Sequence, residues 1–354
     1  MSRRPSRRQG NAATINDVAK RAGVSPMTVS RVINNEDSVR PATRERVNEA
    51  IAALNYSPNQ AARSLAGAHP IRIGLLYSNP SAAYLSEFLV GSLDYASRAN
   101  VQLIVEKCDP GEHESEVAER LIRDGVDGIV LPPPLCDSTE LHAVLRRADA
   151  LAVAVASGHP PAGFSAVSID DHRAAFEMTR HIARLGHRRI GFITGNPNQT
   201  ASERRLEGYR DALAAAGLPA DDALVEQGLF TYRSGLDAAE QLLGLADPPS
   251  AIFASNDDMA AATVAVAHRR GLDVPSDLTV CGFDDTALST TIWPELTTIH
   301  QPITDMSLAA VELLVREIRA RRSGSPEAPV HRQLDFTLVR RQSDAAPRRR
   351  PPVV

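Results

Sequence analysis

The sequence predicts a small all-α module at the N-terminus, followed by a larger α/β core whose parallel sheets form two lobes. Apolar residues recur at helical spacing between residues 15 and 54. After Gly67, apolar β-branched runs alternate with helical stretches, which is typical of βαβ units. The charge divides at the same place, because residues 1–67 hold eleven basic and five acidic side chains (net +6) and the remainder carries −10. We therefore expect a polyanionic partner for the first part only.

The first predicted helix begins near Ile15, where apolar residues recur at i, i+3, i+4 and i+7 as far as Ala22. Gly23 can end this helix, because glycine accepts the left-handed conformation that a helix end often needs. Ser25 is a good N-cap, and Pro26 suits the first position of a second helix. A tight turn is therefore expected between the two helices.

The second helix is predicted to have one buried and one exposed face. Val29, Val32 and Ile33 would pack against the first helix, and a third helix follows Pro41. Two short helices, a tight turn and a supporting helix form a helix-turn-helix, whose second helix can enter the major groove of DNA. The exposed face and its flank carry Met27, Ser30, Arg31 and Asn34.

Arg31 is the strongest candidate for reading a base, because a guanidinium can bond bidentately to guanine. Met27 offers an apolar contact, for example to a thymine methyl group. The alternative is a three-helix packing unit without a ligand, and the net charge of +6 favours DNA. The predicted DNA-contacting residues of this module are Ser25, Pro26, Met27, Thr28, Ser30, Arg31 and Asn34.

Residues 14–67 resemble the headpiece of the LacI/GalR family of bacterial transcription regulators. The resemblance is nearly continuous over "TINDVAKRAGVSPMTVSRVINNEDSVRPATRERVNEAIAALNYSPNQAARSLAG". It implies a homodimer that binds a pseudo-palindromic operator in double-stranded DNA, with one headpiece on each half-site. One departure is Arg40, which precedes Pro41 where a capping serine is more usual, so the third helix should begin without a good cap.

The run "SPNQAARSLAG", residues 57–67, can form about two helical turns, too few for stability in isolation. The resemblance implies that two such hinge helices pair over the operator centre. Leu65 then matches a leucine that wedges into the minor groove, and Asn59 and Arg63 would lie near the backbone or groove edge. Without the headpiece, an ordinary alanine-rich linker would be the simpler interpretation.

The core is predicted from seven apolar runs, and one series of strands ends near residues 168–171, where a second begins. Parallel sheets bind small molecules beyond the carboxyl ends of their strands. Polar residues follow two of these runs, Asn256 and Asp257 after "AIFAS" and Asp284 and Asp285 within "LTVCGFDD". We therefore expect a small-molecule site between two similar lobes.

Catalysis, a metal and a membrane span are not expected. The aspartate pairs could hold a hard cation, but no Walker loop, GxSxG, HExxH or CxxC accompanies them. The sequence therefore predicts neither an enzyme nor a cofactor. The three cysteines (Cys108, Cys136 and Cys281) are scattered, and no apolar run has about 18 residues, which indicates reduced thiols and a cytoplasmic protein with no membrane partner.

The resemblance extends to about Ser343, since "SERRLEGYRDAL" and "GFDDTALSTTIWPELTTIHQP" are similar to the effector-binding core of the same family. That core has the type I periplasmic sugar-binding protein fold. The resemblance implies that Asp284 and Arg205 clamp the effector polar groups and that Phe230 stacks on the ligand. It also places Asn256 and Asp257 over a sugar, and Tyr84 and Leu85 in a loop facing the pocket. Each also has a structural interpretation, since an aspartate at a strand end often caps a helix and Phe230 could belong to the core.

Two departures bear on the ligand. Ala156 stands where the family often places an aspartate, and Gln199 stands where purine-binding relatives carry arginine. The stretches "ASND" and "GFDDT" resemble those of sugar-responsive members. The resemblance therefore implies a small-molecule effector of the sugar or polyol class, with a purine or nucleoside co-repressor as the alternative. A solute-binding protein of the same fold would carry a signal peptide and no DNA-binding module, and an enzyme on that fold remains a further alternative.

The predicted boundaries complete the interpretation. No leucine heptad follows the core, so a dimer is favoured over a tetramer. The segments are a disordered basic tail at 1–13, the helix-turn-helix at 14–57, the hinge at 58–69, the core at 70–343 and a tail at 344–354. Within the core, the N-lobe takes 70–170 and 302–329, and the C-lobe takes 171–301 and 330–343.

Overall fold

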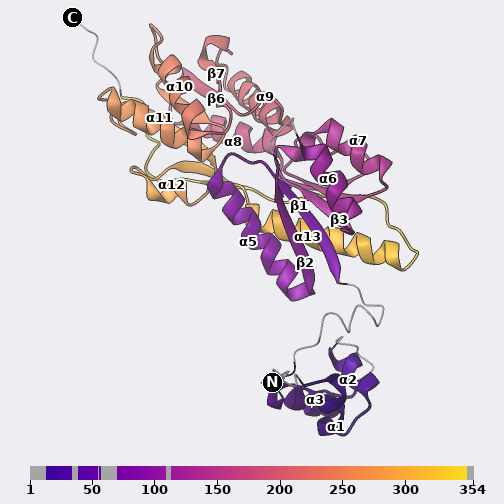
Figure 1. Ribbon diagram of the computed structural model, residues 1–354. Helices are drawn as coiled ribbons and strands as arrows, with labels where there is room; N and C mark the ends of the chain where they lie inside the picture. Colours follow the sequence, from indigo (N-terminus) through magenta and orange to yellow (C-terminus); the bar gives the residue numbers. More distant parts are fainter. Residues whose placement is uncertain (1–12, 34–38, 55, 57–69, 109–112, 349–354) are drawn as a thin grey trace, which may run out of the picture. The chain divides into compact units, whose positions relative to one another are not determined.

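The computed structural model describes residues 13–33, 39–54, 56, 70–108 and 113–348 (Figure 1). The chain forms two compact units, one that ends at Pro70 and one that begins at Ile71. The first unit is all α and the second is α/β, as predicted. The predicted hinge at 58–69 and nearly all of the predicted N-terminal tail lie outside the described residues.

The first unit contains three described helices, α1 (Ile15–Ala22), α2 (Pro26–Ile33) and α3 (Pro41–Ala53). The helix α1 begins with a capping box, in which Thr14 and Asp17 satisfy each other's backbone N–H groups. It ends at Gly23, whose φ of 66° is the left-handed value that favours glycine. The Ser25 hydroxyl accepts a hydrogen bond from the Thr28 N–H at 3.2 Å, so the predicted cap of α2 is confirmed.

The core of this unit is small and apolar. Val18, Val29 and Val47, one from each helix, are fully buried and hold the three helices together. As predicted, Arg40 provides no side-chain cap for α3. The first helical turn of α3 therefore depends on Pro41 at its start and on packing.

The second unit has two lobes, each with a six-stranded sheet within the described residues. The first sheet has the order β11-β5-β4-β3-β1-β2, and the second has the order β12-β10-β9-β8-β6-β7. All strand pairs are parallel except β10 with β12. Strands β3, β6, β8 and β9 are buried along their whole length, as expected for strands covered on both faces.

The strands of the first sheet are β1 (Ile71–Tyr77), β2 (Val101–Lys107), β3 (Gly128–Leu131), β4 (Leu151–Val155), β5 (Ser165–Ser168) and β11 (His331–Gln333). Those of the second are β6 (Ile190–Thr194), β7 (Val225–Gln227), β8 (Ala251–Ala254), β9 (Thr279–Asp284), β10 (Thr297–His300) and β12 (Thr337–Val339).

Helices cover both faces of each sheet. In the first lobe, α5 (Ala82–Ala99) and α13 (Ile303–Arg322) pack side by side on one face, and α6 (Glu114–Arg123) and α7 (Thr139–Arg147) pack on the other (Figure 1). In the second lobe, α8 (Asp171–Arg184) and α9 (Thr200–Ala215) pack together, opposite α10 (Tyr232–Leu243) and α11 (Asp257–Arg269). The short helices are η1 (Leu135–Asp137), η2 (Asp222–Leu224) and α12 (Leu288–Thr291).

Two predicted boundaries are wrong. The C-lobe was expected to resume at residue 330, but His331–Gln333 forms β11, which pairs with β5 in the first sheet. The chain crosses to the second sheet only after β11. The predicted tail at 344–354 is also too long, because Asp344 is buried against the second lobe and the Ala345 carbonyl accepts hydrogen bonds there. Hydrogen bonds hold this segment on the second lobe, and the apolar periodicity used to set the boundary gives no information about hydrogen bonds.

Candidate functional site

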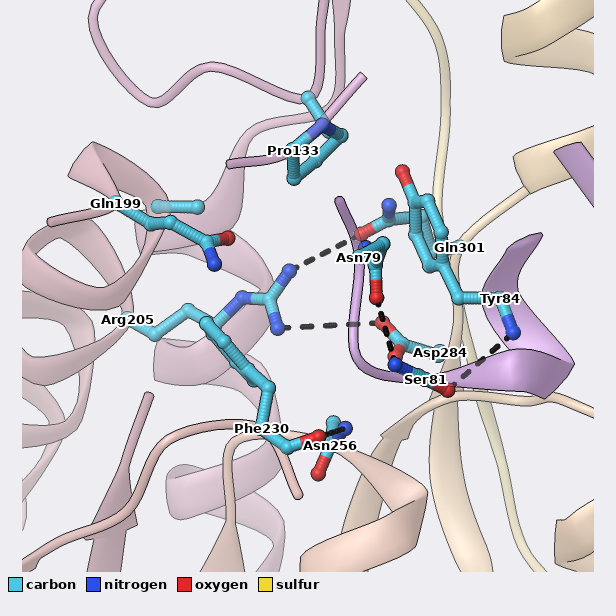
Figure 2. A pocket seen from close by; sticks show the side chains of 12 residues that line it. Asn79, Ser81, Tyr84, Pro133, Gln199, Arg205, Phe230, Asn256, Asp284 and Gln301 are labelled. Carbon is cyan, nitrogen blue, oxygen red and sulfur yellow. Dashed lines mark hydrogen bonds and ion pairs between the residues drawn. The ribbon is translucent and has the colours of Figure 1, made fainter. Parts of the chain in front are cut away.

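A cavity of about 370 Å³, counted to its open mouth, lies between the two lobes of the second unit (Figure 2). Both lobes contribute residues that follow strands, as the strand-end rule predicts. The first lobe contributes Asn79, Ser81, Tyr84, Pro133 and Ala156, and the second contributes Gln199, Ala201, Arg205, Phe230, Asn256, Asp284 and Gln301.

Three residues that line the cavity have left-handed backbone angles. Ala156, after β4, has a φ of 58°, Phe230, after β7, has 59°, and Asp284, at the end of β9, has 103°. Such angles cost free energy for residues other than glycine and are concentrated at functional sites. These three strained positions thus lie where the two lobes present side chains to one cavity.

Arg205 is the centre of the polar network. It rises from α9 and is almost fully buried, with its guanidinium 3.5 Å from the centroid of the Phe283 ring. Nε donates to Asp171 Oδ1 at 2.8 Å, Nη1 to the Ser255 carbonyl at 2.6 Å and Nη2 to Gln301 Oε1 at 3.1 Å. Every nitrogen of the guanidinium is therefore bonded to protein.

Asp284 faces Arg205 at the longer distance of 3.9 Å from Nη1 (Figure 2). Burial raises the pKa of this carboxyl well above its usual value, and the positive charge of Arg205 only partly opposes that effect. The Asp171 carboxyl, which is bonded to Arg205, also has a pKa raised by burial. Burial therefore opposes the ionisation of both carboxyl groups, and Arg205 opposes that effect at both.

Two buried polar groups of the cavity have no hydrogen-bond partner among the described residues. They are the hydroxyl of Tyr84, a side chain 5% exposed, and Nε2 of Gln301, a side chain 1% exposed. Burial also raises the pKa of Tyr84 well above its usual value, so the hydroxyl stays protonated. Buried polar groups are nearly always satisfied, which indicates that a bound molecule or water supplies the partners here.

The structure brings together five of the seven predicted effector-binding residues. Tyr84, Arg205, Phe230, Asn256 and Asp284 all line the cavity. Asn256 also caps α11 by accepting from the Met259 N–H at 3.0 Å, so the structural interpretation holds for it as well.

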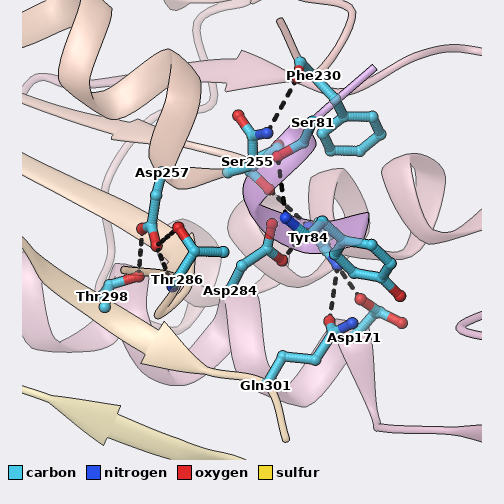
Figure 3. Close-up of polar contacts among 12 residues, drawn as sticks. Ser81, Tyr84, Asp171, Phe230, Ser255, Asp257, Asp284, Thr286, Thr298 and Gln301 are labelled. Atoms are coloured by element: carbon cyan, nitrogen blue, oxygen red, sulfur yellow. Dashed lines mark hydrogen bonds and ion pairs between the residues drawn. The ribbon is translucent and has the colours of Figure 1, made fainter. Parts of the chain in front are cut away.

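Leu85 and Asp257 do not line the cavity. Leu85 follows Tyr84 on α5, and successive helical residues point in different directions. The Asp257 carboxylate accepts from the Thr286 N–H at 2.9 Å and from Thr298 Oγ1 at 2.7 Å, away from the cavity (Figure 3). Burial raises the pKa of Asp257 to about 7. Its side chain therefore holds the loop after β9 on β10.

Sequence reasoning missed several lining residues. Asn79 and Ser81 follow β1, Pro133 follows β3 and Gln301 follows β10. Each lies at the carboxyl end of a parallel strand, so the rule that selected Asn256 could have found them. Gln199 was noted only as a departure from other family members.

In the first unit, the predicted DNA-contacting residues lie on α2 and its cap. Met27 is 64% exposed, Arg31 is exposed and Ser30 is partly exposed, while Val29 and Val32 are buried. Ser25 and Thr28 are hydrogen bonded to each other at 2.9 Å. Asn34, Asn59, Arg63 and Leu65 lie outside the described residues.

Among the described residues, no group of three or more His, Cys, Asp or Glu side chains could hold a metal ion. Among the same residues, every helix is too short or too polar to cross a membrane.

A helix-turn-helix and a two-lobed core with a cavity between its lobes together define the class of DNA-binding transcription regulators. Comparisons with protein families support this class in two parts of the chain. The profile "Bacterial regulatory proteins, lacI family" matches residues 14–59, and "Periplasmic binding protein-like domain" matches residues 179–343. The catabolite control protein A of Priestia megaterium is 34% identical over 91% of this chain and 98% of its own length. The chain therefore belongs to the lacI family and is a transcription regulator, not an enzyme.

Solved structures agree over nearly the full length. A complex of the transcriptional regulator CelR with cellobiose has a TM-score of 0.72 and 33% identity, covering 94% of this chain and 99% of that one. A lac repressor dimer bound to operator and the anti-inducer ONPF has a TM-score of 0.74 and 27% identity, covering 95% and 100%. The all-α module and the two-lobed core are thus those of this family.

Proposed function

We propose that this protein is a ligand-responsive repressor that acts in the bacterial cytoplasm. As a homodimer it binds a pseudo-palindromic DNA operator, and a neutral sugar or polyol in the interlobe cavity changes its affinity for that operator. The proposal of an effector rests on two buried groups, on Tyr84 and Gln301, that have no hydrogen-bond partner among the described residues and share the cavity with Phe230. Hydroxyl groups could satisfy the first two, and the apolar face of a sugar ring could pack on the third.

The charge of the cavity supports a neutral ligand. Arg205 is already bonded to Asp171, Gln301 and a carbonyl, and Asp284 stands nearby. An anionic ligand would have to displace these partners or approach the carboxyl groups, and both cost free energy. The cellobiose complex of CelR, similar over most of this chain, is consistent with a carbohydrate.

Exposed apolar side chains support a homodimer. Val90 (58% exposed) and Leu93 (53%) lie three residues apart on one face of α5. Large exposed apolar residues grouped on a surface mark protein interfaces. The similar lac repressor structure is a dimer on its operator, which agrees with the same assembly here.

Regulation then follows from linkage between the two sites. An effector changes DNA affinity only as far as it binds one arrangement of the dimer better than the other. An inducer favours the arrangement with weak operator binding, and a co-repressor favours the other. Because the cavity lies between the lobes, closure around a ligand is the step that distinguishes these arrangements.

A thermal-shift screen of the full-length protein with sugars, polyols and purines tests the effector class. A ligand at about 100 times its Kd adds roughly 2.7 kcal/mol of stability, enough to raise the Tm by a few degrees. The Asp284→Asn variant should weaken a sugar by at least about tenfold, whereas Asp335→Asn, at an exposed site, should not. A response to purines alone would replace the sugar proposal with a purine co-repressor.

A DNA-binding assay with the same ligands tests the other half. The protein should bind duplex DNA at low salt, and a ligand found in the screen should change its affinity for the operator. A chain that stays monomeric and binds no duplex at low ionic strength, with or without ligand, would refute the proposal.

A further inference from the structure

One carboxylate joins the two lobes beside the cavity. Asp137 ends η1 in the first lobe, and Thr200 begins α9 in the second. Asp137 Oδ2 accepts from the Thr200 N–H at 2.9 Å, and Oδ1 accepts from the Thr200 hydroxyl, also at 2.9 Å. The Thr200 hydroxyl in turn accepts from the N–H groups of Gly158 at 2.8 Å and His159 at 3.1 Å.

These contacts provide a hydrogen-bond acceptor for the N-terminus of α9, which the residues at the start of that helix do not provide. The N-cap residue Gln199 makes no side-chain cap hydrogen bond, and the N–H of Thr200, the first of the helix, has no acceptor within α9. Asp137 supplies that acceptor from the other lobe, and its negative charge lies at the positive end of the helix dipole. The N-terminus of α9 is thus capped by a residue of the other lobe, whereas a helix is usually capped by its own N-cap residue.

The first lobe is shaped to allow this contact. Ser157 is 1% exposed, and its hydroxyl donates to Asp137 Oδ1 at 2.6 Å, which orients the carboxylate. At Gly158, an added Cβ would lie 2.6 Å from the Thr200 carbonyl oxygen, so the backbones could not approach this closely with a larger residue. We call Asp137, Ser157, Gly158 and Thr200 the interlobe clamp.

The interlobe clamp adjoins residues that line the cavity. Thr200 lies between Gln199 and Ala201, and Ser157 follows Ala156, and all three neighbours are lining residues. A second interlobe hydrogen bond runs from the Ser81 hydroxyl to Asp258 Oδ2 at 2.7 Å. Gln199 and Ser81 stand on opposite sides of the cavity in Figure 2. The lobes are therefore joined on both sides of the site.

We infer that Asp137 is a positioning residue of the cavity. By holding the start of α9 on the first lobe, it fixes the separation of the lobes and the places of Gln199 and Ala201. Its importance for effector binding rests on the proposed function. Its role in holding the two lobes together does not. Loss of the interlobe clamp should open the cleft on this side while each lobe stays folded.

Hydrogen–deuterium exchange of the full-length protein, without ligand, tests this inference. In Asp137→Ala and Thr200→Val, peptides that contain Gly158 or Thr200 should exchange at least tenfold faster than in the wild type. Thr200→Ser keeps the hydroxyl and should restore wild-type exchange. The matched control is Ser138→Ala, which removes a cap of α7 within the first lobe (Leu141 N–H to Ser138 Oγ, 3.2 Å) and should leave these peptides unchanged.

Wild-type exchange at these peptides in both Asp137→Ala and Thr200→Val would overturn the inference. If Asp137→Ala does not fold, the Thr200→Val and Thr200→Ser pair decides. Thr200→Val replaces the hydroxyl with a methyl group, whereas Thr200→Ser keeps the hydroxyl and removes the methyl group. Equal acceleration in Thr200→Ser would also overturn it, since the hydroxyl would then not be responsible. The effector proposal fails separately, if no sugar or polyol stabilises the wild type.

Discussion

At the scale of single residues, a substitution of Arg31 tests whether this side chain reads a base or only supports the fold. It lies on the exposed face of α2, opposite Val29 and Val32, so its replacement leaves the buried core of the first unit intact. We expect Arg31→Ala to lose roughly 1–3 kcal/mol of discrimination at one base pair of the operator. Competition binding with operators substituted at single positions measures this loss.

Lys20 offers the matched control for this change. It is an exposed cation in the last turn of α1, so Lys20→Ala removes the same charge from the same unit. We expect it to weaken all duplexes alike, without changing the order of preference among them. If Arg31→Ala also weakened all operators equally, Arg31 would be a phosphate contact and the base-reading assignment would be wrong.

The two aspartates Asp257 and Asp284 show where prediction at this scale ends. Both lie at the carboxyl end of a strand, and both are buried. Asp284 lines the cavity, whereas Asp257 is bound to Thr286 and Thr298. Sequence shows that each is near the strand end, but the direction of a side chain depends on neighbours tens of residues away, here the β10 strand.

At the scale of elements, the packing of α8 on α9 depends on Gly208. A Cβ at Gly208 would lie 2.1 Å from the backbone carbonyl oxygen of His172, which is rigid. Alanine gains about 1 kcal/mol of helix propensity over glycine, but forcing the two helices apart costs more. We expect Gly208→Ala to lower the free energy of unfolding by about 2 kcal/mol, measured by urea titration.

Ala214→Gly on the exposed face of the same helix isolates the propensity effect. It should lower the free energy of unfolding by only about 1 kcal/mol. A stabilised Gly208→Ala variant would mean that α8 and α9 are not in the close contact described here.

A buried carboxylate is one of the groups that hold the C-terminal segment on the second lobe. Asp344 accepts from His181 Nε2 at 2.9 Å and Arg340 Nη2 at 3.0 Å, and from the Thr297 hydroxyl. Burial opposes its ionisation, but these hydrogen bonds and the charges of His181 and Arg340 outweigh burial and lower its pKa to about 2. The ionised carboxylate is thus the form that the fold stabilises.

We expect Asp344 to make stability depend on pH between about 4 and 2. Because its pKa is lower in the folded than in the unfolded chain, its contribution is present above about pH 4 and is lost as the pH falls toward 2. Asp344→Asn should cost about 2 kcal/mol at pH 6 and progressively less at lower pH. Urea titrations at several pH values measure the difference, and Asp335→Asn, at an exposed site, should show none.

Most elements could be predicted from sequence because their causes are local. Helices α1 and α2 are predicted by the spacing of their apolar residues, with Gly23 ending the first and Ser25 capping the second. The central parallel strands are predicted by continuous apolar runs. The strands β11 and β12 could not be separated, because each has three residues and they join different sheets. The contact of Asp137 with Thr200 joins residues 63 apart, and no pattern along the chain marks it.

At the scale of the whole molecule, the uneven charge determines which part meets DNA. Residues 1–67 carry +6 and residues 68–354 carry −10, so a polyanion is attracted by the first part and repelled by the rest. Operator binding should therefore depend on basic side chains of residues 1–67 that neutralise DNA phosphates. Effector binding should not depend on them. The two activities can then be separated by ionic strength.

We expect DNA affinity to fall steeply with salt while the effector affinity stays nearly constant. A protein with roughly 6–10 phosphate contacts loses about 10³–10⁵ in affinity between about 50 and 200 mM salt, because counterions are released from the duplex. A neutral ligand in a buried cavity is little screened by salt. Fluorescence anisotropy with labelled duplex and calorimetry with the sugar found in the screen would measure the two dependences on one preparation. A shallow dependence for DNA would contradict the phosphate-based docking of the first unit, and a steep one for the ligand would show that the cavity binds an ion.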